Sequence, residues 1–215
     1  MELQDVLRST NTCRYFRPDP VENDVLVRTL GAARFAPSGG NRQPVRFVVV
    51  RDPDKRKALG DLYVPIWETY LAAATGGSID VSGASKIIKD ADHFARNIAK
   101  IPVVIVVGAK LADVHPTDDK LGRLSVVGGA SIYPAVHNVL LTARSEGLGT
   151  ALTTLLCEKE TLVKTLLKFP DDISIAATVM MGYPVHPFPK KLTRRSIDES
   201  TFADEYGEPI SEARS

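Results

Sequence analysis

Three short runs of apolar residues place the strongest constraint on the fold of this chain. They cover residues Val45–Val50, Pro102–Gly108 and Ile173–Met181, and β-branched side chains are frequent in them. Runs of this length that are apolar on both faces are typical of strands buried within a sheet. We therefore expect all three segments to be strands of one sheet, with Val45–Val50 at a central position.

Most of the chain between these runs has apolar residues at helical spacing. The expected helices cover residues 2–9, 22–34, 84–99, 132–145 and 158–168, and a further one begins at Asp52-Pro53-Asp54 and ends before residue 75. Pro134 is expected to kink or restart its helix. A chain of 215 residues can bury one large core, so we expect one α+β domain over residues 1–215.

Composition excludes several classes of function. The 27 Lys and Arg residues nearly balance the 26 Asp and Glu residues, so net charge favours neither nucleic acid nor an anionic membrane as a partner. No run of about twenty apolar residues is present, and the first ten residues do not resemble a signal peptide. Cys13 and Cys157 lack metal-type spacing, so we expect no metal site and reduced thiols in a cytoplasmic protein.

Residues Ala36 to Pro44 connect an expected helix to the first strand and carry many polar groups. Their sequence is A-P-S-G-G-N-R-Q-P, in which two prolines fix the backbone and two glycines free it. Ser38, Asn41 and Gln43 add hydroxyl and amide groups that donate and accept hydrogen bonds. Such an open turn suits the close approach of a planar ligand. An ordinary connector with a glycine C-cap is the alternative.

This segment resembles the signature A-P-S-x-x-N-x-Q-P of the FMN-dependent nitroreductase family, with Val45 where tryptophan is usual. Three further segments match in the same order. T-N-T-C-R-Y-F at residues 10–16 is similar to R-R-S-x-R-x-F, and residues 129–150 are similar to the long central helix of the family with its G-L-G-T end. In the last segment, G-Y-P at residues 182–184 matches the G-Y-P that closes a strand in the family. R-R-S at residues 194–196 is similar to the start of the family's R-x-P-L-x-E, with Ser196 in place of the proline.

The resemblance implies a nitroreductase-like fold, with a central, mostly antiparallel sheet flanked by helices and two chains intertwined as a homodimer. Two FMN sites would lie at the dimer interface. Residues 63–100, where the resemblance is weakest, would form a variable lid or helical region. Residues 185–215 would form an extended tail that packs on the dimer partner.

The resemblance also implies contacts to the flavin ring. A guanidinium at Arg14 would lie near N1 and C2=O and favour the anionic reduced form of the flavin. A backbone N–H within residues 151–155 would face N5 and O4, and Thr153 and Thr154 mark this position rather than a side-chain contact. Three aromatic residues are candidates for binding substrate, with a place in the buried core as the alternative. They are Tyr63, Trp67 and Tyr70.

The phosphate end of the expected cofactor site departs from the family. Thr10 and Asn11 replace an arginine pair that in relatives helps to hold the FMN phosphate and ribityl chain, while Arg194 and Arg195 match a phosphate-binding position in the tail. The expected cofactor-binding residues are Asn11, Thr12, Arg14, Pro37, Ser38, Gly39, Asn41, Gln43, Thr153, Thr154, Arg194 and Arg195.

The activity implied by the resemblance is that of an FMN-dependent NAD(P)H oxidoreductase. NADH or NADPH would give a hydride to flavin N5, and a nitroaromatic, a quinone or an activated alkene would then accept electrons in the same place, in ping-pong fashion. No catalytic side chain is expected, because the cofactor carries the chemistry. Oxidative, dehalogenating or flavin-fragmenting chemistry and non-catalytic flavin binding stay open as alternatives.

Overall fold

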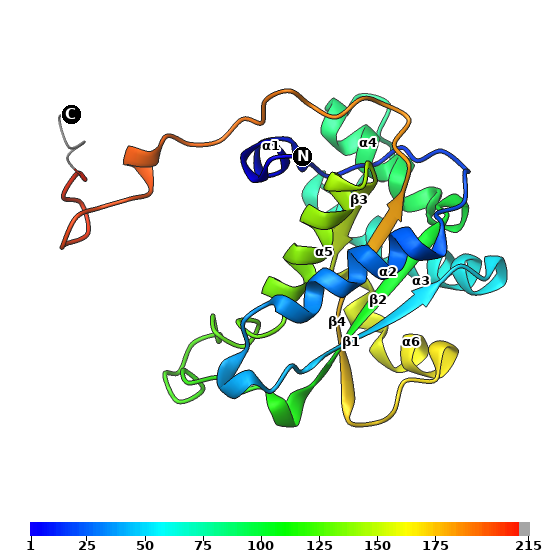
Figure 1. Ribbon diagram of the computed structural model, residues 1–215. Coiled ribbons are helices and arrows are strands. Elements are labelled where there is room, and N and C mark those ends of the chain that lie inside the picture. Colours follow the sequence, from blue (N-terminus) through cyan, green and yellow to red (C-terminus); the bar gives the residue numbers. More distant parts are fainter. Residues whose placement is uncertain (211–215) are drawn as a thin grey trace.

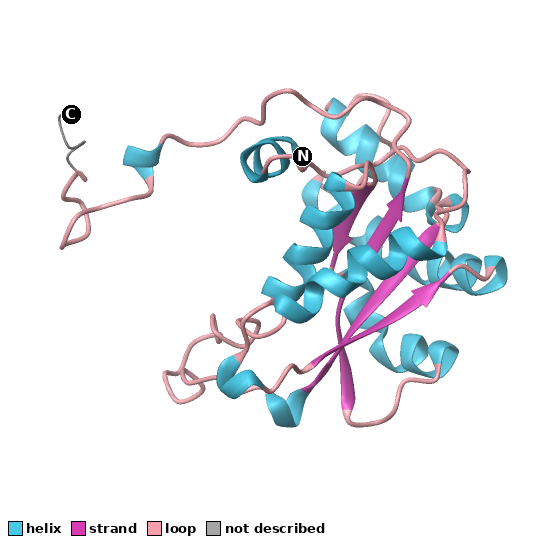
Figure 2. Cartoon of the chain, in the orientation of Figure 1, coloured by secondary structure: helices cyan, strands magenta, loops and turns pink. Residues whose placement is uncertain are grey.

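The computed structural model describes residues 1–210 and has a four-stranded sheet between two layers of helices (Figure 1, Figure 2). The strands lie in the order β1-β2-β4-β3, and every neighbouring pair is antiparallel. This arrangement confirms the predicted α+β fold with an antiparallel sheet flanked by helices, while the homodimer stays a prediction. The strands are β1 (Val45–Val50), β2 (Val103–Lys110), β3 (Gly149–Thr153) and β4 (Ile173–Gly182).

This sheet corrects one strand prediction and contains one strand that was not predicted. Residues Val45–Val50 form an edge strand rather than a central one, and most of its residues are only half-buried. An edge strand covered by helices on both faces is apolar on both faces too, so the sequence pattern did not reveal its position. Strand β3 was not predicted, because five residues with two threonines give too weak an apolar signal.

The expected helices are present with small changes in their bounds. Asp52 caps α3 by accepting a hydrogen bond from the Lys55 backbone N–H at 2.9 Å, and Pro134 lies in the first turn of α5, where it starts the helix rather than kinking it. Short 3-10 turns extend α2 to Phe35 and follow α4 at residues 98–100. The helices are α1 (Leu3–Ser9), α2 (Asn23–Gly31), α3 (Pro53–Ala74), α4 (Lys86–Arg96), α5 (Tyr133–Ser145) and α6 (Glu160–Leu167).

A separate hydrophobic core lies on each face of the sheet. Helices α2 and α5 cover one face, and helices α3, α4 and α6 cover the other. Both cores meet on β2 and β4, whose side chains alternate between the two faces and are almost all buried. Burial on both faces explains why β2 and β4 were recognisable as strands from the sequence.

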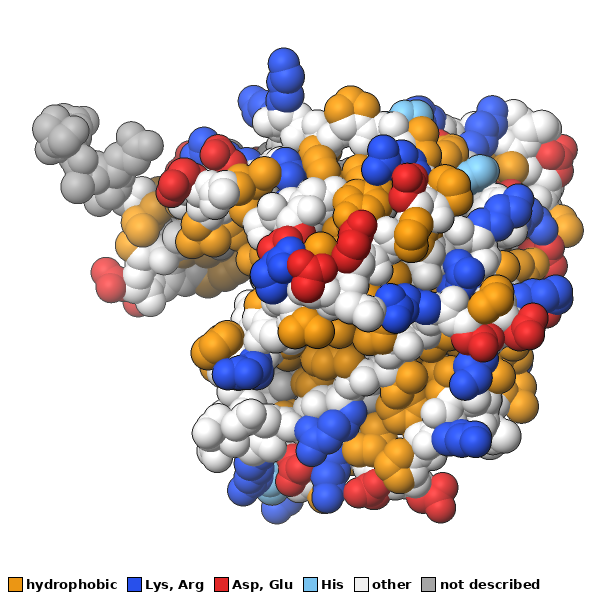
Figure 3. Space-filling view, turned by 45° about the vertical axis from the view of Figure 1, so that its right-hand side comes forward, with side chains coloured by type: hydrophobic (Ala, Val, Ile, Leu, Met, Phe, Trp, Pro, Cys, Tyr) orange, Lys and Arg blue, Asp and Glu red, His pale blue; other side chains and the backbone are white. Residues whose placement is uncertain are grey.

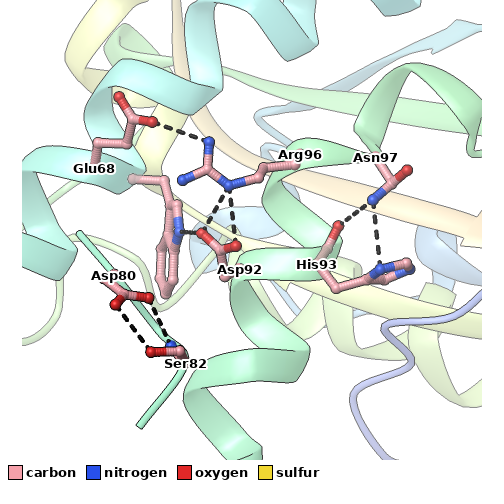
Figure 4. A network of polar contacts seen from close by, with 8 residues as sticks. Glu68, Asp80, Ser82, Asp92, His93, Arg96 and Asn97 are labelled. Atoms are coloured by element: carbon pink, nitrogen blue, oxygen red, sulfur yellow. Dashed lines mark hydrogen bonds and ion pairs between the residues drawn. The ribbon is translucent and has the colours of Figure 1, made fainter. Parts of the chain in front are cut away.

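A polar network joins α3 to α4 (Figure 4). Asp92 is buried on α4 and accepts hydrogen bonds from Trp67 Nε1 and from Arg96 Nε, each at 2.9 Å. Arg96 also forms an ion pair with Glu68 on α3 at 3.0 Å. A buried carboxylate needs such partners, so the network fixes the packing of the two helices. Residues 63–100 are therefore mostly helical, and their role as a lid stays a prediction.

The C-terminal tail, which begins at residue 185, follows an extended path and leads away from the body of the molecule (Figure 1). The start of this tail is held by the Val185 N–H, which donates to the Tyr15 carbonyl at 3.0 Å, and by Phe188, whose ring centre lies 3.7 Å from Cζ of Arg144. Packing of the tail on a dimer partner stays a prediction, and residues 211–215 lie outside the described residues.

No helix within residues 1–210 is both long and apolar enough to span a membrane.

Candidate functional site

The N-terminal segment (residues 11–17) is held against the ends of β3 and β4 by main-chain hydrogen bonds. The Cys13 N–H donates to the Thr150 carbonyl at 2.8 Å, and the Arg17 N–H donates to the Tyr183 carbonyl at 2.8 Å. Because these bonds join backbone to backbone, they fix the path of the segment whatever its side chains are. The segment that carries Arg14 is thus placed beside β3 by the tertiary structure.

Two glycines allow this close approach. A Cβ atom built at Gly149 would lie 2.7 Å from Cys13 Sγ, and one at Gly182 would lie 3.0 Å from Pro102 Cδ and 3.3 Å from Phe16 Cδ1. A side chain at Gly149 would therefore push the N-terminal segment away from β3. The G-L-G and G-Y-P motifs owe these glycines to packing rather than to a phosphate-binding loop.

The outer edge of β3 carries backbone groups that no strand satisfies. The Thr150 carbonyl points away from β4, since it accepts the Cys13 N–H. Backbone direction alternates along an antiparallel strand, so the N–H and C=O of Leu152 also point outward. Within residues 1–210, only the single bridge between Thr12 and Thr150 pairs with this edge. Leu152 lies within the segment 151–155 in which the resemblance implies a backbone contact to the flavin, but the sequence did not single it out, because β3 itself was not predicted.

Arg14, Tyr63 and Thr153 form a cluster next to this edge. The Tyr63 hydroxyl and Thr153 Oγ1 are 3.2 Å apart. Burial raises the pKa of Tyr63, while the hydrogen bond to Thr153 and the nearby positive charge of Arg14 oppose this rise. Arg14 is half-buried and forms no side-chain hydrogen bond or ion pair within the described part of the chain. Its guanidinium is thus available to a ligand.

A cavity of about 150 Å³, the N-terminal cavity, lies beside the N-terminal segment. The Asp90 carboxylate reaches it from α4 and accepts hydrogen bonds from the Tyr15 hydroxyl and from Lys86 Nζ, each at 2.7 Å. These two hydrogen bonds hold the pKa of Asp90 below its usual range. The cavity is lined by Asn11, Thr12, Cys13, Arg14, Tyr15, Lys86, Asp90, Pro184, His186, Pro187 and Phe188.

The signature turn (residues 36–44) has an unusual backbone. Asn41 and Gln43 have φ angles of 54° and 50°, which residues other than glycine rarely adopt. Ser38 Oγ accepts the Gln43 N–H and Ser131 Oγ accepts the Gly39 N–H, each at 3.0 Å. Strained backbone of this kind is concentrated at functional sites, which supports a functional role for the turn.

The signature turn and the N-terminal segment lie at opposite ends of the sheet. The turn precedes Val45, which pairs with Ala109 near one end, whereas Gly149 pairs with Gly182 near the other. A second cavity of about 220 Å³ beside the turn shares no residue with the N-terminal cavity. One chain therefore brings Asn11, Thr12 and Arg14 together but holds the turn apart from them. The second cavity is lined by Leu30, Ala33, Arg34, Ala36, Ser38, Gln43, Val45, Arg46, Phe47, Ser131 and Ala135.

The remaining predicted site residues have varied surroundings. Tyr63 and Trp67 belong to the core on the α3 side, while Tyr70 is exposed. Arg194 and Arg195 are exposed in the tail and line neither cavity. Thr154 is exposed at the end of β3 and lines a groove beside the first turn of α5, and Pro37 is exposed in the signature turn. The binding roles of these residues stay predictions.

A model described as the nitroreductase family matches residues 7–183, so this chain belongs to the nitroreductase family.

Three relatives show how varied the chemistry of similar proteins is. The chain is 29% identical over 184 residues to 5,6-dimethylbenzimidazole synthase of Rhodobacter capsulatus, covering 85% of this chain and 83% of that protein. It is 28% identical to NADH dehydrogenase of Thermus thermophilus, covering 80% and 81%. It is 24% identical to iodotyrosine deiodinase of Thermotoga neapolitana, covering 87% and 91%.

Solved structures support the fold. A nitroreductase with bound FMN from Desulfitobacterium hafniense DCB-2 superposes with a TM-score of 0.69 at 19% identity, covering 95% of this chain and 100% of that one. At 19% identity this likeness shows the fold alone.

Proposed function

We propose that this protein is an FMN-dependent NAD(P)H oxidoreductase that reduces nitroaromatic, quinone or activated-alkene acceptors as a homodimer. The observation that carries the proposal is the half-buried Arg14, which has no partner within residues 1–210 and lies near the free edge of β3. Membership of the nitroreductase family, the name of the Thermus relative and the FMN in the Desulfitobacterium structure support it.

The residues at the free edge of β3 fit an isoalloxazine ring. The outward N–H and C=O of Leu152 match the hydrogen-bonding edge of a flavin, and Gly149 keeps the approach to β3 open. Arg14 would hold the N1 and C2=O side, and Thr12 the ribityl chain. When bound, FMN supplies the N5 atom that accepts a hydride and later returns two electrons to the acceptor.

The side chains of this protein would supply a positive charge beside the flavin and hold the end of β3 in a fixed position. The cation of Arg14 favours the negative charge that develops near N1 on reduction. Tyr63 is buried and hydrogen-bonded to Thr153, so it holds the end of β3 in place. The residues that choose between NADH and NADPH would lie near residues 63–100.

A homodimer would explain why the predicted cofactor residues are divided between the two ends of the sheet. A two-fold axis can place the signature turn of one chain next to Arg14 of another. Hydrophobic side chains are gathered in a hollow on one face of the molecule (Figure 3), which is typical of a surface that binds another protein. Exposed apolar residues include Leu7, Phe35, Leu121, Leu124, Val126, Tyr133 and Leu152.

The test is a visible absorbance spectrum of the purified protein, recorded anaerobically before and after addition of NADPH or NADH. We expect the bands of oxidised flavin to bleach with at least one nucleotide and to return when a quinone is added. A protein that stays colourless when FMN is supplied would contradict the whole proposal. A yellow protein that neither nucleotide bleaches would contradict the reductase activity alone.

Flavin fragmentation by oxygen is the second candidate function. It is favoured by the 29% and 27% identity to two proteins named 5,6-dimethylbenzimidazole synthase. Irreversible loss of the flavin spectrum when the reduced protein meets oxygen would select this function. Recovery of the full spectrum would exclude it.

A further inference from the structure

The N-terminal cavity is lined by nitrogen-bearing side chains that the sequence did not associate with the cofactor. Its wall includes Asn11 and Thr12, which occupy the phosphate end of the expected site, together with Lys86 and His186. Lys86 is far from Asn11 and Thr12 in the sequence. It lies in the first turn of α4, within the region where the family resemblance is weakest. The fold therefore adds a lysine at the place where the sequence lacks an arginine pair.

The size of this cavity selects a small ligand group. Its volume is about 150 Å³. Sites for drug-sized ring systems usually measure roughly 300 to 1,000 Å³. A flavin ring would not fit inside it, whereas a phosphate group with a few water molecules would. The ring would instead lie outside the cavity, along the edge of β3.

The charges around the cavity suit an anion. Two cations, Arg14 and Lys86, face one carboxylate, Asp90. Both oxygens of Asp90 already accept hydrogen bonds, one from the Tyr15 hydroxyl and one from Lys86 Nζ. Asp90 therefore tethers Lys86 at the cavity, and its negative charge is largely balanced there. His186 lies edge-on to the Tyr15 ring, with 5.3 Å between ring centres, and adds a further nitrogen donor.

We propose that Lys86, tethered by Asp90, binds the phosphate of FMN in the N-terminal cavity together with Asn11 and Thr12. Lys86 thereby replaces the arginine pair that Thr10 and Asn11 do not provide. This inference rests on the proposed FMN site, and it assigns α4 a direct part in holding the cofactor. The tail residues Arg194 and Arg195 do not line this cavity in the same chain.

The test compares two flavins that differ only in the phosphate. Flavin is removed from the full-length protein, and the dissociation constants of FMN and of riboflavin are measured by quenching of flavin fluorescence. We expect Lys86→Met to weaken FMN binding about tenfold, the scale of one charged hydrogen bond made by a largely exposed lysine, and to leave riboflavin binding unchanged. Lys86→Arg keeps the charge and should retain most of the FMN affinity.

Lys89→Met is the matched control, since Lys89 is exposed on the same helix and does not line the cavity. It should change neither dissociation constant. Equal loss of FMN and riboflavin affinity in Lys86→Met would place Lys86 at the ring and overturn the inference, as would an unchanged FMN affinity. If the unaltered protein binds neither flavin, the proposed function itself fails.

A double variant separates direct binding from neutralisation of Asp90. In Lys86→Met with Asp90→Asn, both charges are absent. Direct binding by Lys86 predicts that the loss of FMN affinity persists in the double variant. Full recovery would show that Lys86 only screens Asp90, and it would overturn the inference.

Discussion

The two ends of the sheet carry the two halves of the candidate site, and they are built differently. At the end where β3 begins, main-chain hydrogen bonds and two glycines hold the N-terminal segment, so its position depends on contacts between residues distant in sequence. At the other end, the signature turn is shaped largely by its own residues, through Ser38 and the positive φ angles of Asn41 and Gln43. One half therefore depends on packing and the other mainly on local chemistry.

The largest expected effect tests whether the two halves serve one site from different chains. Arg14→Met damages one half and Asn41→Asp damages the other, and each alone should lower reductase activity at least tenfold. In mixed dimers of the two variants, one site receives both intact halves, so random mixing should restore about a quarter of the activity. The measurement is quinone-dependent NAD(P)H oxidation by the co-expressed variants.

The control for this experiment places both substitutions in one chain. Mixing that double variant with Arg14→Met leaves no site with two intact halves, so activity should stay low. If mixing Arg14→Met with Asn41→Asp also restores nothing, the two halves do not act across a dimer.

The next largest effect concerns the glycine contact beneath the N-terminal segment. Gly149→Val forces a side chain against Cys13, and overpacking of this kind costs about 2–3 kcal/mol in the free energy of unfolding. FMN affinity should fall as well, because Arg14 moves with the segment. Urea denaturation and flavin titration measure the two effects. Gly31→Ala is the control, since a Cβ there meets nothing within 4 Å, and it should not destabilise the protein.

A smaller effect is expected from the hydroxyl that shapes the signature turn. Ser38→Ala leaves the Gln43 N–H without its acceptor, at a cost of about 1 kcal/mol in the free energy of unfolding. The free energy of FMN binding should be weakened by more than about 1 kcal/mol, because the lost hydrogen bond shapes the turn itself and contributes little to the rest of the fold. Thr193→Ala in the exposed tail serves as the control. Equal FMN affinity in Ser38→Ala and the control would contradict a binding role for the turn.

The smallest expected effect is a pH dependence of the free energy of unfolding, which arises from Asp118 in the loop next to the signature turn. Hydrogen bonds from Ser125, from the Val126 N–H and from Arg123 hold the pKa of Asp118 below its usual range. A lowered pKa in the folded state stabilises the protein above pH 4 or so, the range of the unfolded carboxyl, and this contribution is lost as the pH falls further.

Asp118→Asn should therefore destabilise the protein near pH 7. The difference from the unaltered protein should shrink as the pH falls through 4 towards 3. Thermal unfolding at several pH values measures this difference. A difference that is independent of pH would show that the Asp118 charge contributes nothing to stability.

The parts of the fold that the sequence revealed are those with a strong local pattern. Strands β2 and β4 are buried on both faces, and α3 has a capping Asp52 followed by a proline, so each has a clear signature. Strand β3 and the edge position of β1 had no such signature. Strand order depends on which segments pair, and apolar periodicity carries no information about pairing.

The sequence by itself determined the family and the composition of the signature turn, and it predicted a flavin-binding role for Arg14, because these rest on residue types at fixed local spacing. Only the tertiary structure decided that the two halves of the site lie at opposite ends of the sheet, that Leu152 presents the free edge of β3, and that Lys86 shares a cavity with Asn11. The physical reason is that backbone direction along an edge strand, and contacts between residues far apart in sequence, arise only when the sheet is assembled.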